Sequence, residues 1–318
     1  MRHVIFGAGN IGEVRYRSHA GEIAAVIDNS PEKQGGSFHG LPIISLETYR
    51  REEAYRALPI FITTYHWAEI ERQLQENGIH HYQLAPEIYA DVNAPVDPDI
   101  IHEKWPAYLK KLCDRPGCEV LEVGSRMVTG DYFRDYFQEA AYTGFDFYPG
   151  KNVDVVGDAH RLSSYFDKKF DLIFSSAVFE HFFMPWKVSV EMIKLLKPGG
   201  YVFVETHFAQ GRHEMPWHFF HFTENGLDVL FPEAFGMKCV KKSVFNLLEG
   251  RFSETEQTSP YLRGQMMANL YCHTEYLGRK VADLPEEALS WDRVGPEDLA
   301  RGTVYPQPEN GPADGADF

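Results

Sequence analysis

The sequence predicts an α/β protein of two domains, each built on a mainly parallel β-sheet that helices cover on both faces. Short apolar runs alternate with amphipathic helical stretches along the chain, and this alternation is typical of βαβ units. The pattern occurs twice, before and after residues 90–98, where two prolines indicate a linker. A length of 318 residues also fits two domains better than one.

Composition and charge narrow the class of protein. Hydrophobic residues make up 44% and charged residues 24%, which is enough for buried cores. The net charge of -15 repels phosphate backbones, so we expect no nucleic-acid partner. The four cysteines are too scattered for a disulfide scaffold, and no apolar stretch is long enough for a membrane span. No signal peptide is recognised at the amino terminus, so we expect a cytoplasmic protein.

The first 90 residues contain the elements of the first sheet. Strands are predicted at residues 3–6, 23–27, 59–63 and 81–84. Helices are predicted after the first strand and at residues 46–57 and 67–77. We expect the four strands to pair in parallel, since helical segments separate them.

A glycine-rich turn after the first strand is the candidate ligand site of this domain. Gly7, Gly9 and Gly12 form a G-x-G-x-x-G pattern, and Asp28 ends the next strand, as in dinucleotide-binding sites. Residues 26–36 and 40–43 resemble the amino-terminal domain of bacterial nucleotide-sugar acyltransferases, which implies a nucleotide-sugar ligand. Nucleotide-sugar binding, a structural role without a ligand, and NAD binding all stay open.

The second domain repeats the alternation of strands and helices. Strands are predicted at residues 118–123, 141–145, 153–156, 170–174 and 201–206, with closing strands at 237–245 and 267–277. We expect helices in the gaps, most clearly at 186–196, and a polar insert at 246–265. The chain then divides into a nucleotide-binding-like domain (1–91), a linker helix (92–113), a second domain (114–281) and a tail (282–318) whose end we expect to be disordered.

Three successive strand ends in the second domain carry ligand-binding residue types. Gly124 ends the first strand and allows close approach of a ligand to the backbone. Asp146 ends the second strand, where a carboxylate can accept hydrogen bonds from a ribose diol. Asp158 follows the third strand and is placed to reach an adenine amine. Three such ends in order are a stronger signal than any one of them.

Five segments, taken in order, resemble the class I S-adenosylmethionine-dependent methyltransferases of type 11. They are residues 120–130, 142–150, 153–160, 170–181 and 195–205, of which the last two are the most specific. The resemblance covers residues 118–281 and implies a seven-stranded methyltransferase sheet with an antiparallel closing strand. Both domains are therefore expected to be Rossmann-like, and S-adenosylmethionine is the implied cofactor.

The resemblance also implies roles for single residues in cofactor binding. Glu122 and Gly124 would line the methionine end, Asp146 the ribose and Asp158 the adenine. The remaining members of the expected cofactor set are Ser125, Arg126, Phe147, Ala159 and Ser175. The sequence departs from the family pattern at residues 124–130, where glycines usually stand two apart. There Ser125 and Arg126 could supply backbone amides and a cation for the cofactor carboxylate.

Histidines follow the fourth and fifth strands, beside the expected methyl acceptor. A histidine can take the proton of an acceptor hydroxyl near neutral pH, so His181, His207 and His221 are the candidate catalytic residues. Each could also have a structural role. Residues 213–223 resemble a loop of bacterial relatives that more often has an acidic residue and an arginine at the positions of His218 and His221. We predict no metal site, because the spacing of Glu180, His181 and a later histidine is not diagnostic.

We therefore predict a methyltransferase that modifies a hydroxyl of a sugar, nucleotide sugar or surface-polysaccharide intermediate. The expected partner is a small-molecule or glycan substrate. Oxygen is not distinguished here from nitrogen or carbon as the methylated atom. A catalytically degenerate nucleotide-sugar-binding or scaffold protein, and a NAD-linked enzyme using the first domain, remain as alternatives.

Overall fold

The computed structural model describes residues 1–90, 93–128, 130, 132–255 and 257–295. The chain divides into two compact units, Met1–Pro95 with Phe245–Cys272, and Val96–Val244 with His273–Phe318. This division differs from the expected one in two segments. Residues 245–272 group with the first unit, and the expected linker segment contributes a helix to the core of the second. The predicted disorder at 302–318 falls outside the described residues.

The first unit contains a six-stranded sheet in the order β3-β4-β2-β1-β5-β6. Its strands are β1 (His3–Phe6), β2 (Ile23–Ile27), β3 (Ser37–Phe38), β4 (Leu41–Ile44), β5 (Ile60–Ile62) and β6 (Tyr82–Leu84). Its helices are α1 (Asn10–His19), α2 (Leu46–Arg51) and α3 (Trp67–Glu76). All pairs except β3–β4 are parallel. The four predicted strands are confirmed; the antiparallel edge strand β3 was not predicted.

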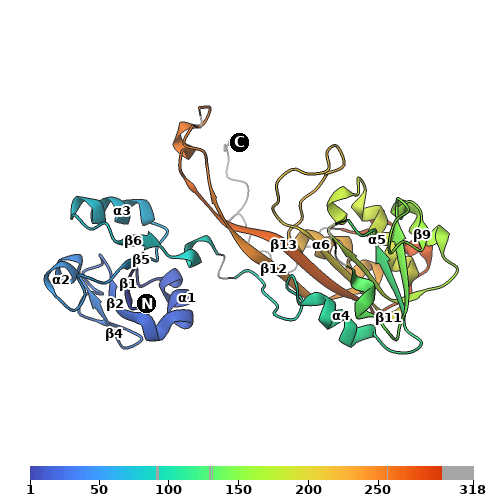
Figure 1. Cartoon of the computed structure of the whole chain (residues 1–318), viewed down its shortest axis with the longest axis horizontal. Helices are drawn as coiled ribbons and strands as arrows, with labels where there is room; N and C mark the ends of the chain where they lie inside the picture. The colour runs from blue at the N-terminus through green and yellow to red at the C-terminus, as the bar shows by residue number, and fades with distance from the viewer. Residues whose placement is uncertain (91–92, 129, 131, 256, 296–318) are drawn as a thin grey trace, which may run out of the picture. The chain divides into compact units, whose positions relative to one another are not determined.

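The second unit contains a seven-stranded sheet in the order β12-β13-β11-β10-β7-β8-β9 (Figure 1). Its strands are β7 (Glu119–Val123), β8 (Ala141–Asp146), β9 (Val155–Val156), β10 (Phe170–Ser176), β11 (Leu196–His207), β12 (Met237–Arg251) and β13 (Met266–Lys280). Strands β7 to β11 pair in parallel, whereas β13 runs antiparallel to β11. The predicted sheet with its antiparallel closing strand is therefore confirmed.

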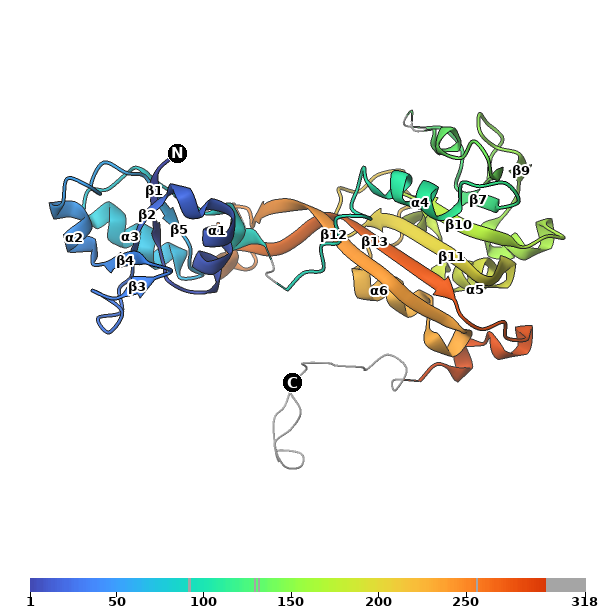
Figure 2. The same ribbon diagram turned by 90° about the horizontal axis from the view of Figure 1, so that it is seen from below.

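Helices cover both faces of this sheet. Figure 2 shows α4 (Trp105–Cys113) on one side and α5 (Pro185–Leu195) and α6 (Glu224–Leu230) on the other. Trp105 of α4 is fully buried, and its ring stacks on Phe203 at 4.9 Å between centroids. On the opposite face Met192 and Leu227 are completely buried in the other core cluster. Burying such side chains on both faces stabilises the sheet by roughly 1.5–3 kcal/mol for each large apolar residue.

The connections after β7 and β8 differ from the prediction that helices fill the gaps. In the described part of these connections there is a single 3₁₀ turn (Phe133–Tyr136) between β7 and β8, and no helix between β8 and β9. Side chains hold the short loops instead. Asp154 accepts a hydrogen bond from the Gly144 backbone at 2.7 Å, and Arg134 pairs with the same carboxylate. The connection between β8 and β9, which runs only from Phe147 to Asp154, is too short for a helix that would pack on the sheet.

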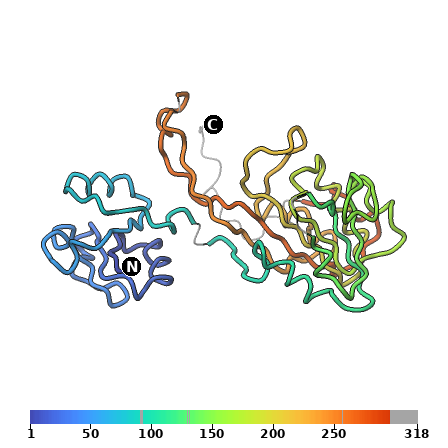
Figure 3. Tube along the Cα trace, in the orientation of Figure 1, coloured from blue at the N-terminus to red at the C-terminus, as the bar shows by residue number. Residues whose placement is uncertain are grey.

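Two further predictions of the sequence are corrected. The helix expected at residues 46–57 ends at Arg51, and the one expected from Pro98 begins only at Trp105. The insert expected at 246–265 begins as strand, because β12 continues to Arg251, and β13 starts directly after it at Met266 (Figure 3). Leu247 and Met266 pack against Ile88 of the first unit's core, which supports pairing despite the polar composition. None of the described helices is both long and apolar enough to cross a membrane.

Two buried glutamates face each other across β11 and β13. Glu205 and Glu275 are directly paired in register and are 4% and 0% exposed. Glu205 accepts hydrogen bonds from Ser176 at 2.7 Å and is 2.5 Å from His102 Nδ1. Glu275 accepts one hydrogen bond from the His102 backbone, while its Oε2 atom has no partner among the described residues. Burial, then the charge of Glu205, raises the pKa of Glu275 to about 9.

This pair predicts a pH-dependent stability. The folded chain keeps on Glu275 a proton that the unfolded chain releases above its ordinary pKa of 4.5. The stabilisation is therefore complete below that pH and is lost as pH rises toward about 9. Glu275→Gln should lose less thermal stability than the wild type between about pH 6 and pH 9, measured by circular dichroism. The exposed Glu139→Gln is the control, and equal losses in all three proteins would contradict the assignment.

Candidate cofactor and acceptor site

Asp146 lies at the carboxyl end of β8. Neighbouring backbone N–H groups fix its carboxylate, which can still accept further hydrogen bonds from a ligand. Its Oδ2 atom accepts a hydrogen bond from the Arg126 backbone at 3.1 Å, and Oδ1 accepts one from the Tyr148 backbone at 3.0 Å. An ionised carboxylate can accept about four hydrogen bonds, so about two remain for a ribose diol. The Arg126 side chain, expected beside the cofactor carboxylate, instead lies 3.6 Å from Asp146 Oδ1.

Asp158 lies in a comparable setting after β9. Its Oδ1 atom accepts a hydrogen bond from the His160 backbone at 2.9 Å and lies 2.7 Å from His160 Nδ1. The Asp158 side chain is 39% exposed and can reach a ligand amine. These interactions with His160 outweigh the effect of burial and lower the pKa of Asp158, so it remains an acceptor at neutral pH. Next to it Ala159 is buried, while Phe147 at the end of β8 is exposed.

Glu122 and Ser125 lie below this edge and fix the loops. Glu122 is buried and accepts hydrogen bonds from the Tyr142 hydroxyl and, at 2.9 Å, from Asn152 Nδ2. Burial raises the pKa of Glu122 to about 7. Ser125 Oγ donates to the Asn152 carbonyl at 3.0 Å. Both side chains thus anchor the turn that carries Asn152, and their expected contacts with the cofactor stay predictions.

Gly124 and Ser175 lie where a ligand could approach. Gly124 has a φ of 88°, and a Cβ atom built there would come within 2.2 Å of the Val178 side chain. Glycine is therefore required at this strand end. Ser175, on β10, is fully buried, and its Oγ has no hydrogen-bond partner among the described residues. The carboxylates of Asp146 and Asp158 are thus the acceptors that the strand ends present, which fits an adenosyl ligand.

The three predicted catalytic histidines come together with two others. His181 ends a 3₁₀ turn after β10, His207 ends β11, and His221 lies on the following loop. The rings form a chain through His213 and His218. Adjacent centroids are 5.1 Å apart for His181–His213, 5.2 Å for His207–His213, 4.3 Å for His213–His218 and 4.8 Å for His218–His221. We call these five residues the histidine cluster.

Glu180 lies at the base of the histidine cluster, and sequence reasoning did not include it among the site residues. It is completely buried, and its Oε2 atom accepts a hydrogen bond from Thr206 at 2.6 Å. Its Oε1 atom is 2.9 Å from His207 Nδ1. The interactions with His207 and Thr206 outweigh burial and hold the pKa of Glu180 below its usual range. The only sequence signal was its position beside His181, directly after a buried strand.

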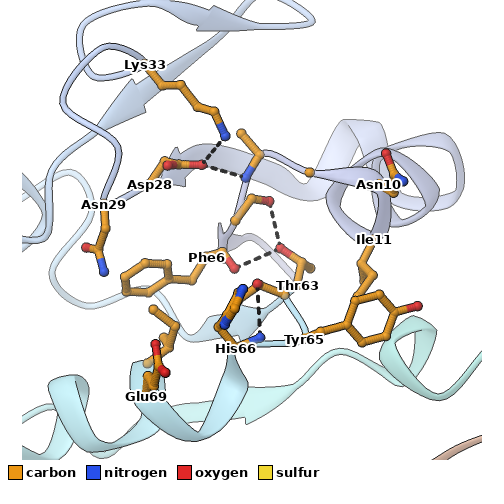
Figure 4. Close-up of a pocket in the computed structure, with 15 residues that line it drawn as sticks. Phe6, Asn10, Ile11, Asp28, Asn29, Lys33, Thr63, Tyr65, His66 and Glu69 are labelled. Carbon is orange, nitrogen blue, oxygen red and sulfur yellow. Dashed lines mark hydrogen bonds and ion pairs between the residues drawn. The ribbon is translucent and has the colours of Figure 1, made fainter. Parts of the chain in front are cut away.

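The glycine-rich turn of the first unit borders a cavity of about 480 Å³. Figure 4 shows Asp28 and Lys33 on one side of it and Tyr65 and His66 on the other. Asp28 accepts hydrogen bonds from the Ala8 and Ser30 backbones at 3.1 and 2.9 Å and from Lys33 Nζ at 3.2 Å. Asp28 thus ties the turn to β2 and also faces the cavity.

The three glycines of this turn differ in their surroundings. A Cβ on Gly7 would come within 2.9 Å of the Thr63 carbonyl, and one on Gly12 within 2.4 Å of the Gly7 carbonyl. Packing alone therefore requires glycine at both of these positions. Gly9 precedes α1, and a Cβ there would meet nothing within 4 Å. A ligand requirement for glycine can therefore be tested at Gly9 without disturbing the fold.

Comparisons with known proteins found a family match within the second unit and several similar solved structures. Residues 121–204 match the family described as methyltransferase domain. No curated protein matches the chain. Similar solved structures include YcgJ from Bacillus subtilis (16% identity, 57% of this chain and 100% of that one, TM-score 0.40) and a SAM-dependent methyltransferase from Aquifex aeolicus (16%, 58% and 94%, 0.37). Another is the plantazolicin methyltransferase BamL, solved with an analogue and SAH (18%, 56% and 82%, TM-score 0.38).

At these identities and TM-scores the solved structures carry no inference about substrate. The family match covers β7 to β11, whose carboxyl ends carry Gly124, Asp146, Asp158 and Glu180. The strand order, the residues at the strand ends and the family match all concern this part of the chain. The chain thus carries a methyltransferase domain at residues 121–204.

Proposed function

We propose that the chain is an S-adenosylmethionine-dependent methyltransferase. Its methyl acceptor would be a hydroxyl group of a sugar, a nucleotide sugar or a surface-polysaccharide intermediate. The observation that carries this proposal is the loop after β11, which combines polar rings with exposed aromatic side chains. Trp217 and Phe219 are 60% and 41% exposed and neighbour His218 in sequence. Flat aromatic faces beside hydrogen-bonding groups suit a ring with an apolar face and several hydroxyls. The four free cysteines favour a reducing, cytoplasmic compartment.

The reaction requires little covalent chemistry from the protein. The acceptor oxygen attacks the methyl carbon of the cofactor, the carbon–sulfur bond breaks, S-adenosylhomocysteine leaves, and the hydroxyl proton passes to a base. The protein aligns the acceptor with the methyl group and excludes water. Residues of the histidine cluster are placed at the ends of β10 and β11 to orient the hydroxyl and to receive its proton.

For the first unit we propose binding of the nucleotide part of a nucleotide sugar. The supporting observation is the cavity beside Gly9 and the start of α1, where Lys33 adds a positive charge. The first backbone N–H groups of a helix and a nearby cation favour a phosphate. NAD is the rival ligand, because the same turn and Asp28 would suit a dinucleotide.

Asp146 supplies a test of the cofactor site. Asp146→Ala removes the ribose acceptor and should weaken S-adenosylhomocysteine binding by roughly 1–3 kcal/mol, as measured by isothermal titration calorimetry. Asp146→Asn keeps one acceptor oxygen and should lose less. Asp135→Ala, an exposed site in the same unit, should leave affinity unchanged. Wild-type affinity in a folded Asp146→Ala protein would remove Asp146 from the site.

Gly9 supplies a test of the ligand of the first unit. A nucleotide sugar such as a UDP-sugar should raise the melting temperature, because it binds only the folded state. Gly9→Val should abolish that shift while keeping the melting temperature of the free protein, since its Cβ has open space. If NADH alone raises the melting temperature, the dinucleotide replaces the nucleotide sugar. If neither ligand acts, the proposed nucleotide site is wrong.

Trp217 supplies a test of the acceptor class. Transfer of labelled methyl groups to a panel of sugars, nucleotide sugars and glycans should identify an acceptor. Trp217→Ala should then raise the acceptor KM about tenfold, roughly 1.4 kcal/mol of lost stacking, with S-adenosylhomocysteine affinity unchanged. Tyr261→Ala, which removes another exposed ring, is the control. Labelling of amine or carbon acceptors, with none of the hydroxyl compounds, would reject the proposal.

A further inference from the structure

Three potential metal ligands converge at the base of the histidine cluster. Glu180, His181 and His213 each offer one ligand atom, and these atoms all lie within 4.8 Å of one another. Glu180 and His181 follow β10, whereas His213 belongs to the loop after β11. The sequence predicted no metal here, since a histidine 32 positions after His181 is not a known ligand spacing. The fold brings them together.

Both histidines have one ring nitrogen engaged with the backbone. His181 Nδ1 lies 2.8 Å from the Trp217 carbonyl, and His213 Nδ1 lies 3.0 Å from the Gly211 carbonyl. A carbonyl oxygen only accepts, so each Nδ1 carries the proton in the neutral ring. Each Nε2 therefore carries a lone pair. Metal-binding histidines are oriented in this way in proteins, by donating the other ring N–H to a carbonyl or carboxylate.

The carboxylate of Glu180 supplies an independent observation. Its side chain is completely buried, and Oε1 forms no hydrogen bond of acceptable geometry with the described residues. The nearby His207 Nδ1, at 2.9 Å, is likewise without a hydrogen bond. His181 Nε2 lies 3.8 Å from the same Oε1 atom. A buried, incompletely paired carboxylate oxygen is costly, and a bound cation would offset that cost.

In the other candidate cluster of the described chain, the carboxylate among the three potential ligands is fully paired. His102, Glu205 and His273 also lie within ligand range of one another. Both oxygens of Glu205, however, have partners, since Oε2 accepts from Ser176 and Oε1 lies 2.5 Å from His102 Nδ1. A cation there would have to displace a formed interaction. The comparison favours the cluster at Glu180.

We propose that Glu180, His181 and His213 bind one divalent transition-metal ion of the zinc type. Two imidazoles and one carboxylate suit Zn²⁺, whereas Mg²⁺ and Ca²⁺ prefer ligand sets made of oxygen. Bond lengths of about 2.0–2.1 Å place tetrahedral ligand atoms about 3.4 Å apart. Closing from the present separations requires side-chain movements of about 1 Å. Glu214 Oε2, 3.8 Å from His181 Nε2, is near enough to serve as a further ligand.

The metal would have a consequence for catalysis, which rests on the proposed function. A position left open by three protein ligands could bind the acceptor oxygen and make its hydroxyl more acidic. His181 would then be a ligand rather than the general base that the sequence suggested. Binding of the metal itself does not depend on which acceptor is methylated.

The test measures metal binding by the full chain without acceptor. Tag-free protein, stripped with a chelator, is titrated with Zn²⁺ in a calorimeter, and metal content is checked by mass spectrometry. We expect one Zn²⁺ per chain and no binding of Mg²⁺. His181→Ala and His213→Ala should each weaken Zn²⁺ affinity at least tenfold while remaining folded by circular dichroism. His102→Ala and the exposed His66→Ala should keep wild-type affinity.

The outcomes separate this inference from the proposed function. No stoichiometric Zn²⁺ binding, or binding that survives both His181→Ala and His213→Ala, overturns the metal site. Loss of binding in His102→Ala alone would move the metal to the other cluster and also overturn it. Zn²⁺ binding as expected, combined with no methyl transfer to hydroxyl compounds, would support the metal site and reject only the acceptor class.

Discussion

The hydrogen bonds of the Glu180 backbone and side chain are the constraint on which the methyl-acceptor side of the domain depends. The Glu180 carbonyl accepts hydrogen bonds from the Phe219 and Phe220 backbones at 2.8 and 3.2 Å, while Thr206 holds the side chain. The Phe222 backbone donates to the His207 carbonyl at 2.9 Å. These bonds tie the loop after β11 to the ends of β10 and β11. The aromatic and imidazole side chains of the loop are therefore positioned by main-chain contacts.

The cofactor side is stabilised separately. Asp146 and Asp158 are oriented by backbone N–H groups within their own loops, and Glu122 supports the turn at Asn152 from below. Backbone donors make strong, fixed partners for a carboxylate and cost little conformational entropy. The two sides meet near Gly124 and Val178. They also meet at His160, whose ring lies 4.1 Å from that of Phe183 and whose Nε2 atom accepts a hydrogen bond from the Met184 backbone at 3.4 Å. The loop after β11 takes part in neither contact, so substitutions in it should leave cofactor affinity largely intact.

Much of the fold could be predicted because local patterns decide it. Strand ends at Gly124, Asp146 and Asp158 were recognisable from buried runs followed by glycine or aspartate. The helix expected after β8 is not formed, since the short connection and the turn chemistry of residues 149–154 outweigh the general alternation. In the longer connection after β7, the described residues form only a 3₁₀ turn. The extension of β12 and β13 could not be predicted from the sequence. Leu247 and Met266 stabilise it by packing against Ile88, which is a contact between distant segments.

The site was less predictable than the fold, for a physical reason. Histidines after strands were visible in the sequence, but their mutual contacts depend on how one loop returns across two strand ends. Glu180 was considered only as a metal ligand without diagnostic spacing and was left out of the site, because a carboxylate shortly after a buried strand is usually exposed. Here the returning loop covers it completely.

Burial of the Glu180 carboxylate also explains why it can influence the chemistry of the site. A charge removed from water must be compensated by partners, and the side-chain atoms around Glu180 are a threonine hydroxyl and imidazole nitrogens. An imidazole can compensate by holding a proton or by sharing a cation with the carboxylate. The backbone bonds of His181 and His213 fix the proton on Nδ1 of each ring, so their Nε2 atoms have no proton to offer in the neutral form. Sharing a cation is then the arrangement that satisfies all three groups together.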